Sequence, residues 1–302
     1  MSFPRRLSVA SEVTVFRDTR AVLVESIWWD ARSDEVVWVD ITAGLLHRGP
    51  LDGAVDGSDD RIVELPPPLS AVQPAAGGGY VAALKDRVVL LDEHGRIERE
   101  LATLPHRHDG MRLNEGKVDP FGRFVVGGME LTTDDADATV WSVDGDGAVR
   151  VISGGFAVAN GMEWSDDGRT MYLTDTGTST VYRAPYGPDG ELGELEPFLV
   201  GRASDGLTMA ADGSFANGLY GEGAVAHWNT AGEIVDETAM PAPNITSVAF
   251  VGPDLRTLLV GSARENLTEE QLQRHPLSGG IFRLDHPIGG RGVHTFGVAS
   301  TP

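Results

Sequence analysis

The feature that most constrains the fold is a repeat of short β-rich runs, spaced 43, 44, 47, 44 and 43 residues apart. A period of about 40–50 residues with several strands per period is typical of propeller blades. Five intervals predict six blades, so we expect an all-β fold, a six-bladed β-propeller with four-stranded antiparallel blades. The intervals join six anchor positions, which are Trp38, Val81, Val125, Tyr172, Ala216 and Leu259.

The two ends of the chain carry strand-like runs outside these periods. We expect Val13–Phe16 and His294–Val298 to share one blade and close the ring, which removes exposed sheet edges. One helix is predicted at Leu267–Leu272, with Thr268 as its N-cap and Pro276 after its end. No linker or change of composition interrupts the chain, so residues 1–302 are expected to form a single propeller domain.

The charge excludes some partners. The formal net charge is -21, with 45 acidic against 24 basic residues, and such a surface repels phosphate backbones. The acidity serves solubility or attracts cations, and both readings stay open.

With no cysteine, disulfides and thiolate metal sites are excluded. No run is long enough to span a membrane, and residues 1–13 contain Arg5 and Arg6 but lack the apolar core of a signal peptide. We expect a cytoplasmic monomer or small homo-oligomer, with no nucleic-acid or membrane partner.

Polar residues recur at one phase of the repeat. Because the innermost strand of every propeller blade runs along the central channel, residues of equal phase emerge at the same end of it. The second blade offers the glycine run Gly77–Gly79 near this phase and no carboxylate. Polar residues 11 to 13 positions before an anchor occur in the other five blades, namely Glu25, Asn114, Asn160, Asp205 and Thr246.

This register points to a metal ion. Glu25 and Asp205 would repel each other in a narrow channel, and a divalent cation removes that conflict. The candidate ligand atoms are all oxygens, which suits a hard cation. We expect one divalent ion, Ca²⁺ first, with Mg²⁺, Mn²⁺ and Zn²⁺ as alternatives. The competing interpretation is that these residues only start turns, since Asn and Asp before Gly commonly do so.

At these residues the chain resembles the senescence marker protein, gluconolactonase and regucalcin family of six-bladed propellers, from Glu25 to about Gly292. The segments that carry the resemblance are Glu25–Asp30 with Trp38–Ile41, Arg112–Pro120, Asn160–Ser165 with Asp167–Arg169, Asp205–Thr208, Ser247–Phe250 with Gly252–Leu255, and Pro276–Leu277 before Gly279–Gly280.

The resemblance implies roles for individual residues. It implies that Glu25, Asn160 and Asp205 bind the metal, and that Arg112 and Asn114 contact the substrate. Family members commonly hydrolyse sugar lactones, and some are described mainly as calcium-binding proteins. Three departures from the family pattern remove none of these metal ligands: Val24-Glu25-Ser26-Ile27 stands where Gly-Glu-Gly-Pro is frequent, Glu115 stands where Asp is common, and Ala216 and Tyr220 replace tryptophans.

The chemistry expected is hydrolysis of a sugar lactone such as gluconolactone. In this scheme a metal ion polarises the ring carbonyl, and Asp205 accepts a proton from water. Arg112 pairs with substrate oxygens, and Asn114 and Glu115 form hydrogen bonds with sugar hydroxyls. Two alternatives stay open: a calcium-binding propeller without turnover, and a scaffold for proteins. The segment His106–Asp109 resembles a metal cluster but lies outside the register, and no Gly-x-Ser-x-Gly motif indicates a serine hydrolase.

Overall fold

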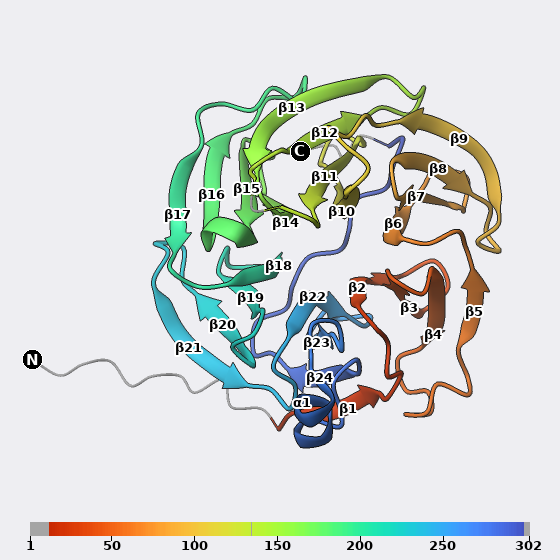
Figure 1. Cartoon of the computed structure of the whole chain (residues 1–302), viewed down its shortest axis with the longest axis vertical. Helices are drawn as coiled ribbons and strands as arrows, with labels where there is room; N and C mark the ends of the chain where they lie inside the picture. Colours follow the sequence, from red (N-terminus) through yellow and green to blue (C-terminus); the bar gives the residue numbers. More distant parts are fainter. Residues whose placement is uncertain (1–11, 134, 299–302) are drawn as a thin grey trace, which may run out of the picture.

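The protein folds into a ring of six sheets around a central channel (Figure 1). The computed structural model describes residues 12–133 and 135–298. Each sheet has four strands, and the strands within a sheet pair antiparallel in the registers that the structure gives. The predicted all-β, six-bladed propeller with four-stranded antiparallel blades is therefore confirmed.

The strands of each blade follow one another from the channel outward. Blade 1 contains β2 (Val24–Asp30), β3 (Glu35–Asp40), β4 (Leu45–Pro50) and β5 (Arg61–Glu64); blade 2 contains β6 (Leu69–Pro74), β7 (Tyr80–Leu84), β8 (Arg87–Leu91) and β9 (Ile97–Thr103); blade 3 contains β10 (Met111–Val118), β11 (Phe124–Glu130), β12 (Ala138–Val143) and β13 (Val149–Phe156). Blade 4 contains β14 (Ala159–Trp164), β15 (Thr170–Asp175), β16 (Thr180–Pro185) and β17 (Glu196–Val200); blade 5 contains β18 (Ser204–Met209), β19 (Phe215–Leu219), β20 (Ala224–Trp228) and β21 (Ile234–Ala239); blade 6 contains β22 (Ile245–Val251), β23 (Thr257–Ser262), β24 (Ile281–Asp285) and β1 (Thr14–Arg17).

The ring is closed by the N-terminal strand alone. β1 pairs with β24 and becomes the outermost strand of blade 6, as expected for Val13–Phe16. The expectation that His294–Val298 shares this blade is wrong. Phe296 instead bridges to Ala75, because β1 and β23 already occupy both edges of β24. The C-terminal segment crosses the ring toward blades 2 and 3 (Figure 1), where Phe296 meets Ala75 and the Gly297 N–H donates to Gly122 O at 2.8 Å.

Short helical segments interrupt the strands. A 3-10 turn, η1 (Thr176–Thr178), follows β15, and the predicted helix is confirmed as α1 (Glu269–Arg274). The Thr268 side chain accepts from the Gln271 N–H, and the Gln271 side chain accepts from the Thr268 N–H, which completes a capping box. In the described part of the chain, no helix is long and apolar enough to cross a membrane.

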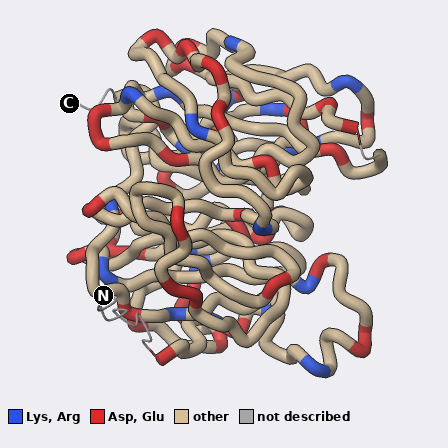
Figure 2. The backbone as a smooth tube through the Cα atoms, turned by 90° about the vertical axis from the view of Figure 1, so that its left-hand side faces the viewer, with Lys and Arg blue, Asp and Glu red and all other residues tan. Residues whose placement is uncertain are grey.

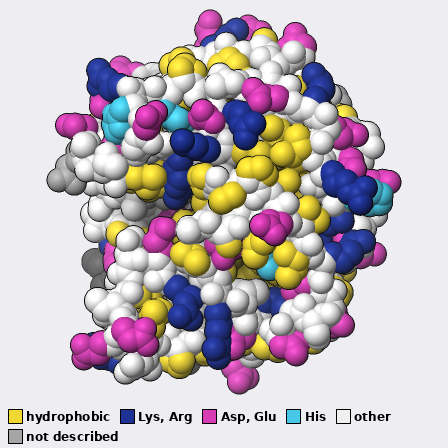
Figure 3. Space-filling model, turned by 45° about the vertical axis from the view of Figure 1, so that its right-hand side comes forward, with side chains coloured by type: hydrophobic (Ala, Val, Ile, Leu, Met, Phe, Trp, Pro, Cys, Tyr) yellow, Lys and Arg dark blue, Asp and Glu magenta, His cyan; other side chains and the backbone are white. Residues whose placement is uncertain are grey.

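The core lies between neighbouring sheets. Trp28 and Trp38 are fully buried, Trp28 in the hydrophobic cluster between blades 1 and 2 and Trp38 in the one between blades 1 and 6. Acidic residues outnumber basic ones by 45 to 24, and the side view in Figure 2 shows many of them on loops. On the face in Figure 3, hydrophobic side chains are mixed with charged ones. Among the described residues, the large exposed hydrophobics are Val, Ile and Leu, and none is aromatic. This surface gives no support to the scaffold interpretation.

A β-bulge interrupts every innermost strand near its start. In each blade the pairing between the first and second strands shifts by one residue at the phase where the polar residues recur. A bulge bends the strand and redirects its side chains. The residues at or within these bulges are Glu25, Ser70, Asn114, Asn160, Asp205 and Thr246.

The closing strand is tied to blade 1 by a buried ion pair. Arg17 donates from Nε and Nη2 to Asp60 at 3.0–3.1 Å, and both side chains are at most 1% exposed. We expect Arg17→Ala to lower the free energy of unfolding by about 3–5 kcal/mol, because Asp60 would stay buried without a partner. Chemical denaturation followed by circular dichroism measures this loss.

The matched control for this prediction is Arg61→Ala. Arg61 pairs with Glu35 at the surface, and its side chain is 59% exposed, so its loss should cost less than about 1 kcal/mol. Equal, small losses for both variants would contradict a closing role for Arg17.

Candidate functional site

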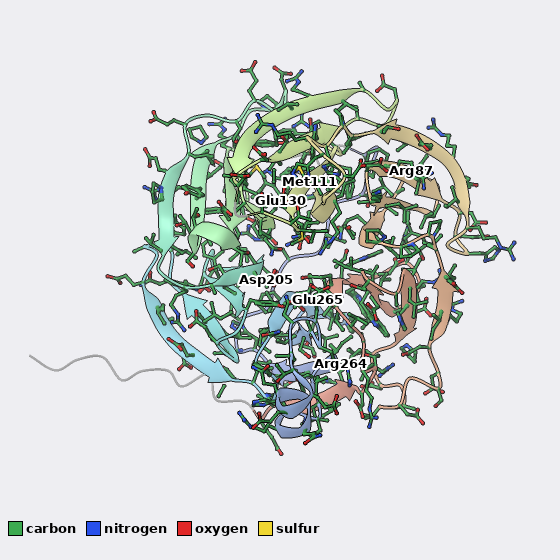
Figure 4. All side chains as sticks on the ribbon, viewed as in Figure 1. Arg87, Met111, Glu130, Asp205, Arg264 and Glu265 are labelled. Carbon is green, nitrogen blue, oxygen red and sulfur yellow. The ribbon has the colours of Figure 1, made fainter. Side chains whose placement is uncertain are left out.

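Five of the six predicted site residues line one pocket at the channel mouth. Glu25, Asn114, Asn160 and Asp205 come from the bulges of blades 1, 3, 4 and 5, and Arg112 joins them. Figure 4 shows Asp205 near the centre of the ring. The pocket, called the site pocket below, is lined by Leu23, Glu25, Arg112, Asn114, Met129, Val158, Asn160, Thr176, Asp205, Tyr220, Glu265 and Asn266.

The other two blades supply structural residues at this phase. Thr246 does not line the pocket; its hydroxyl donates to Val24 O at 2.5 Å and ties blade 6 to blade 1. In blade 2 the bulge holds Ser70, whose hydroxyl donates to Leu113 O at 2.6 Å. The placement of Gly77–Gly79 near this phase is wrong, because these residues form the turn between β6 and β7 at the other end of the strand.

Glycines after two of the ligand candidates allow neighbouring blades to approach. A Cβ atom at Gly161 would lie 2.5 Å from Asp205 O, and one at Gly206 would lie 2.7 Å from Thr246 O. Both distances are too short for any side chain. The Asn160-Gly161 and Asp205-Gly206 pairs therefore mark close contact between innermost strands rather than the turns that such pairs usually start.

Three buried oxygens in the site pocket have no hydrogen-bond partner among the described residues. They are Glu25 Oε2, Asn160 Oδ1 and Asp205 Oδ1, one from each predicted metal ligand. Buried polar atoms are nearly always paired, so three orphaned oxygens in one pocket indicate a missing positive partner. Their chemistry fits a hard divalent cation such as Ca²⁺.

The orientation of the Asn160 amide follows from its neighbour. The Thr176 hydroxyl donates to Ser204 O at 2.7 Å, so it can only accept from Asn160 Nδ2, which lies 3.1 Å away. The amide NH₂ group is thereby fixed on Thr176, and Asn160 Oδ1 is left available as a ligand.

The two carboxylates resist joint ionisation. Burial raises the pKa of Glu25 well above its usual value, and the charges of Asp205 and Glu115 raise it further. Burial, followed by the charge of Glu115, raises the pKa of Asp205 to about 7, although Asn160 and Arg112 oppose the shift. A cation bound between the carboxylates would remove this penalty, because an opposite charge favours the ionised form.

Arg112 and Asn114 form a fixed pair beside these carboxylates. Arg112 Nη1 donates to Asn114 Oδ1 at 2.7 Å and to Leu113 O at 2.9 Å, and Asn114 Nδ2 donates to Ala159 O at 3.2 Å. Within the described chain, all the side-chain hydrogen bonds of Arg112 come from Nη1. Its Nε and Nη2 therefore remain for a ligand. Burial lowers the Arg112 pKa, while Glu265, Glu25 and Asp205 oppose that shift.

The structure does not bring Glu115 into the site pocket. Glu115 lines a second cavity, together with Gln73 and the Lys117–Glu163 ion pair, which spans 2.9 Å. Arg291 to His294 of the C-terminal segment cover this cavity. Adjacent residues of the β10 bulge thus face different cavities. Burial raises the pKa of Glu115. From this second cavity, the charge of Glu115 raises the pKa values of Glu25 and Asp205.

The segment His106–Asp109 is not a metal cluster. His106 Nε2 contacts Lys85 O at 3.2 Å, His108 Nε2 pairs with Glu130 at 2.6 Å, and Arg107 pairs with Asp137. Nowhere in residues 12–133 and 135–298 do three His, Cys, Asp or Glu side chains gather as a metal site. The candidate centre consists of two carboxylates and one amide, and so does not depend on such a group.

The outer wall of the site pocket was not predicted. Met129, Thr176 and Tyr220 line it, and each lies four residues after the anchor of its own blade. This second shared phase, at the end of the second strand, is a signal that could have found them. Glu265 and Asn266 come from the loop after β23 and follow no repeat phase, so no sequence signal marked them.

A family model described as SMP-30/Gluconolactonase/LRE-like region matches residues 23–264. The chain belongs to this family. The chain is 35% identical over 268 residues to a 6-deoxy-6-sulfogluconolactonase from Pseudomonas putida, covering 87% of this chain and 90% of that one. It is 30% identical to pentonolactonase XacC from Haloferax volcanii, covering 92% and 96% of the two chains. A solved structure from Agrobacterium tumefaciens, described as the calcium-binding protein regucalcin, superposes with a TM-score of 0.87 at 27% identity, covering 95% and 97%.

The raised pKa of Asp205 predicts a pH-dependent stability of the metal-free protein. With a folded pKa of about 7 against an ordinary value of 3.8, the stability that this group contributes is full below about pH 3.8 and is lost as the pH rises through about 7. Asp205→Asn removes this titration. We expect its thermal midpoint, measured with a chelator, to rise relative to wild type by about 2 °C or more between about pH 5 and pH 8.

The control for this measurement is Asp189→Asn, at an exposed position away from the pocket. Its difference from wild type should stay constant with pH. A constant difference for Asp205→Asn as well would contradict the raised pKa.

Proposed function

We propose that this protein is a divalent-metal-dependent lactonase that opens a sugar lactone to the aldonic acid. The observation that carries the proposal is the set of three orphaned oxygens, from Glu25, Asn160 and Asp205, beside the guanidinium of Arg112 in one pocket. The names of the Pseudomonas and Haloferax relatives support a lactone substrate. They specify different lactones, so the sugar depends on this chain's own pocket.

Glu25, Asn160 and Asp205 would hold the ion, with Ca²⁺ expected first. A bound divalent cation polarises a carbonyl and lowers the pKa of water. Only three protein ligands are proposed, so coordination positions remain for substrate and water. The protein's part is to bring carboxylate and amide oxygens together in a buried pocket and to leave them unpaired.

Asp205 also moves the proton, and Arg112 and Asn114 orient the substrate. Asp205 accepts a proton from the water that attacks the lactone carbonyl, and it returns this proton to the ring oxygen when the bond between that oxygen and the carbonyl carbon breaks. Arg112, fixed by Asn114, presents Nε and Nη2 to the substrate oxygens and to the carboxylate that forms. We do not place Glu115 in the contact set, because it lines the other cavity.

A calcium-binding protein without turnover is the second candidate, favoured by the description of the Agrobacterium structure. Such a protein needs the three oxygen ligands but has no use for a buried guanidinium with free N–H groups beside them. Arg112 costs energy to bury, and its placement in the site pocket favours the lactonase.

Removal of the metal tests the proposal directly. We expect chelation to abolish proton release from gluconolactone and divalent metal to restore it. Asp205→Ala should lower kcat/KM by about 100-fold or more while circular dichroism stays unchanged. Asp189→Ala, at an exposed position, is the matched control. Full activity in stringently metal-free protein would refute the mechanism, and metal binding without turnover of any lactone would support the second candidate.

The two unpaired nitrogens of the Arg112 guanidinium, Nε and Nη2, give a second prediction. Arg112→Lys keeps the charge but cannot present two parallel N–H groups, so kcat/KM should fall about 10- to 100-fold. Steady-state kinetics on the same lactone measures this loss, and unchanged metal affinity by titration calorimetry separates it from damage to the metal ligands. An Arg112→Lys variant as active as wild type would exclude a bidentate role.

A further inference from the structure

A third carboxylate, from Glu265, lies on the outer wall of the site pocket. Glu265 belongs to the loop between β23 and α1 and lines the pocket together with Arg112 and Asp205. Figure 4 shows Glu265 and Asp205 near each other at the centre of the ring. Neither the metal site nor the hydrolytic step described above uses this side chain.

The loop that carries Glu265 is held in place. The Glu265 N–H donates to Val22 O at 3.0 Å, and its carbonyl accepts from Asn244 Nδ2 at 2.8 Å and from the Tyr220 hydroxyl at 3.4 Å. Asn266 Nδ2 donates to the same Tyr220 hydroxyl at 3.0 Å. The side chain of Glu265 is therefore presented from a fixed backbone, as a specificity group must be.

The carboxylate of Glu265 has one oxygen available. Oε1 accepts from the Thr42 hydroxyl at 3.3 Å, while no described residue donates to Oε2. Across the pocket, Glu265 is the charge that most strongly opposes the lowered pKa of Arg112. Glu265 thus faces the pocket as a hydrogen-bond acceptor that carries its own negative charge.

The charges of the site pocket leave no cation free for an anionic substituent. Among the described lining residues, Arg112 is the only basic one, against the carboxylates of Glu25, Asp205 and Glu265. A divalent ion would balance Glu25 and Asp205, which leaves Arg112 opposite Glu265. A carboxylate accepts hydrogen bonds from sugar hydroxyls but repels a second carboxylate or a sulfonate.

We propose that Glu265 determines the substrate class, selecting a neutral polyhydroxylated lactone and excluding one that carries a carboxylate or sulfonate on its exocyclic carbon. Its Oε2 accepts a hydrogen bond from a hydroxyl of the lactone, and its charge repels an anionic group at the same place. This inference rests on the proposed lactonase function.

The test compares two lactones and three variants. The lactones are glucono-1,5-lactone and the same ring with a sulfonate in place of the exocyclic hydroxyl. The variants are Glu265→Gln, Glu265→Asp and, as control, Glu269→Gln on the exposed face of α1. We expect wild type to prefer the neutral lactone. Glu265→Gln should lose about tenfold in kcat/KM for it and gain about tenfold for the sulfonated one.

The outcomes separate this inference from the function on which it rests. The measured quantity is the ratio of kcat/KM for the neutral lactone to kcat/KM for the sulfonated one. The inference is supported if Glu265→Gln shifts this ratio about 100-fold, Glu265→Asp shifts it less, and Glu269→Gln leaves it unchanged. Turnover of both lactones with a ratio that Glu265→Gln leaves unmoved, or a wild type that prefers the sulfonated lactone, overturns the inference alone. A wild type that turns over neither lactone, while binding metal, overturns the lactonase proposal and this inference with it.

Discussion

The channel mouth is organised around one constraint. Its two buried carboxylates, Glu25 and Asp205, resist being ionised together without a cation. Burial raises the pKa of both Glu25 and Asp205, and neighbouring carboxylates raise these pKa values further, Asp205 and Glu115 for Glu25 and Glu115 for Asp205. A buried charge without a partner is costly, so a cation between the two carboxylates would stabilise their ionised forms. The orphaned oxygens of the same two residues and of Asn160 are the atoms that we propose as ligands of that cation. Arg112 and Asn114 stand close enough to serve a substrate.

Backbone geometry brings these carboxylates together. A bulge at the same phase of each innermost strand bends the chain there. Gly161 and Gly206 then allow neighbouring strands to approach more closely than a Cβ atom would permit. The candidate ligands from different blades thus converge because the ring brings equivalent bulges to one mouth.

The two walls of the site pocket come from different parts of the blades. The innermost strands supply the proposed ligand oxygens, whereas the ends of the second strands and the loop after β23 supply Tyr220 and Glu265. Burial raises the pKa of Tyr220 to about 12, with Glu265 adding to the shift, so its hydroxyl stays protonated and can donate. A propeller can therefore keep one metal centre while its outer loops set the substrate.

The sequence by itself determined the blade count and which polar side chains of different blades meet in one pocket, because a fixed period converts spacing along the chain into convergence at one mouth. It could not decide which cavity Glu115 lines, because adjacent residues in a bulge diverge according to local backbone geometry. It also could not place the C-terminal segment or Glu265. Both lie in segments outside the repeat, and their positions depend on contacts with other blades, such as Phe296 with Ala75 and Glu265 with Val22. Only the closed ring fixes those contacts, because they join residues far apart in the sequence.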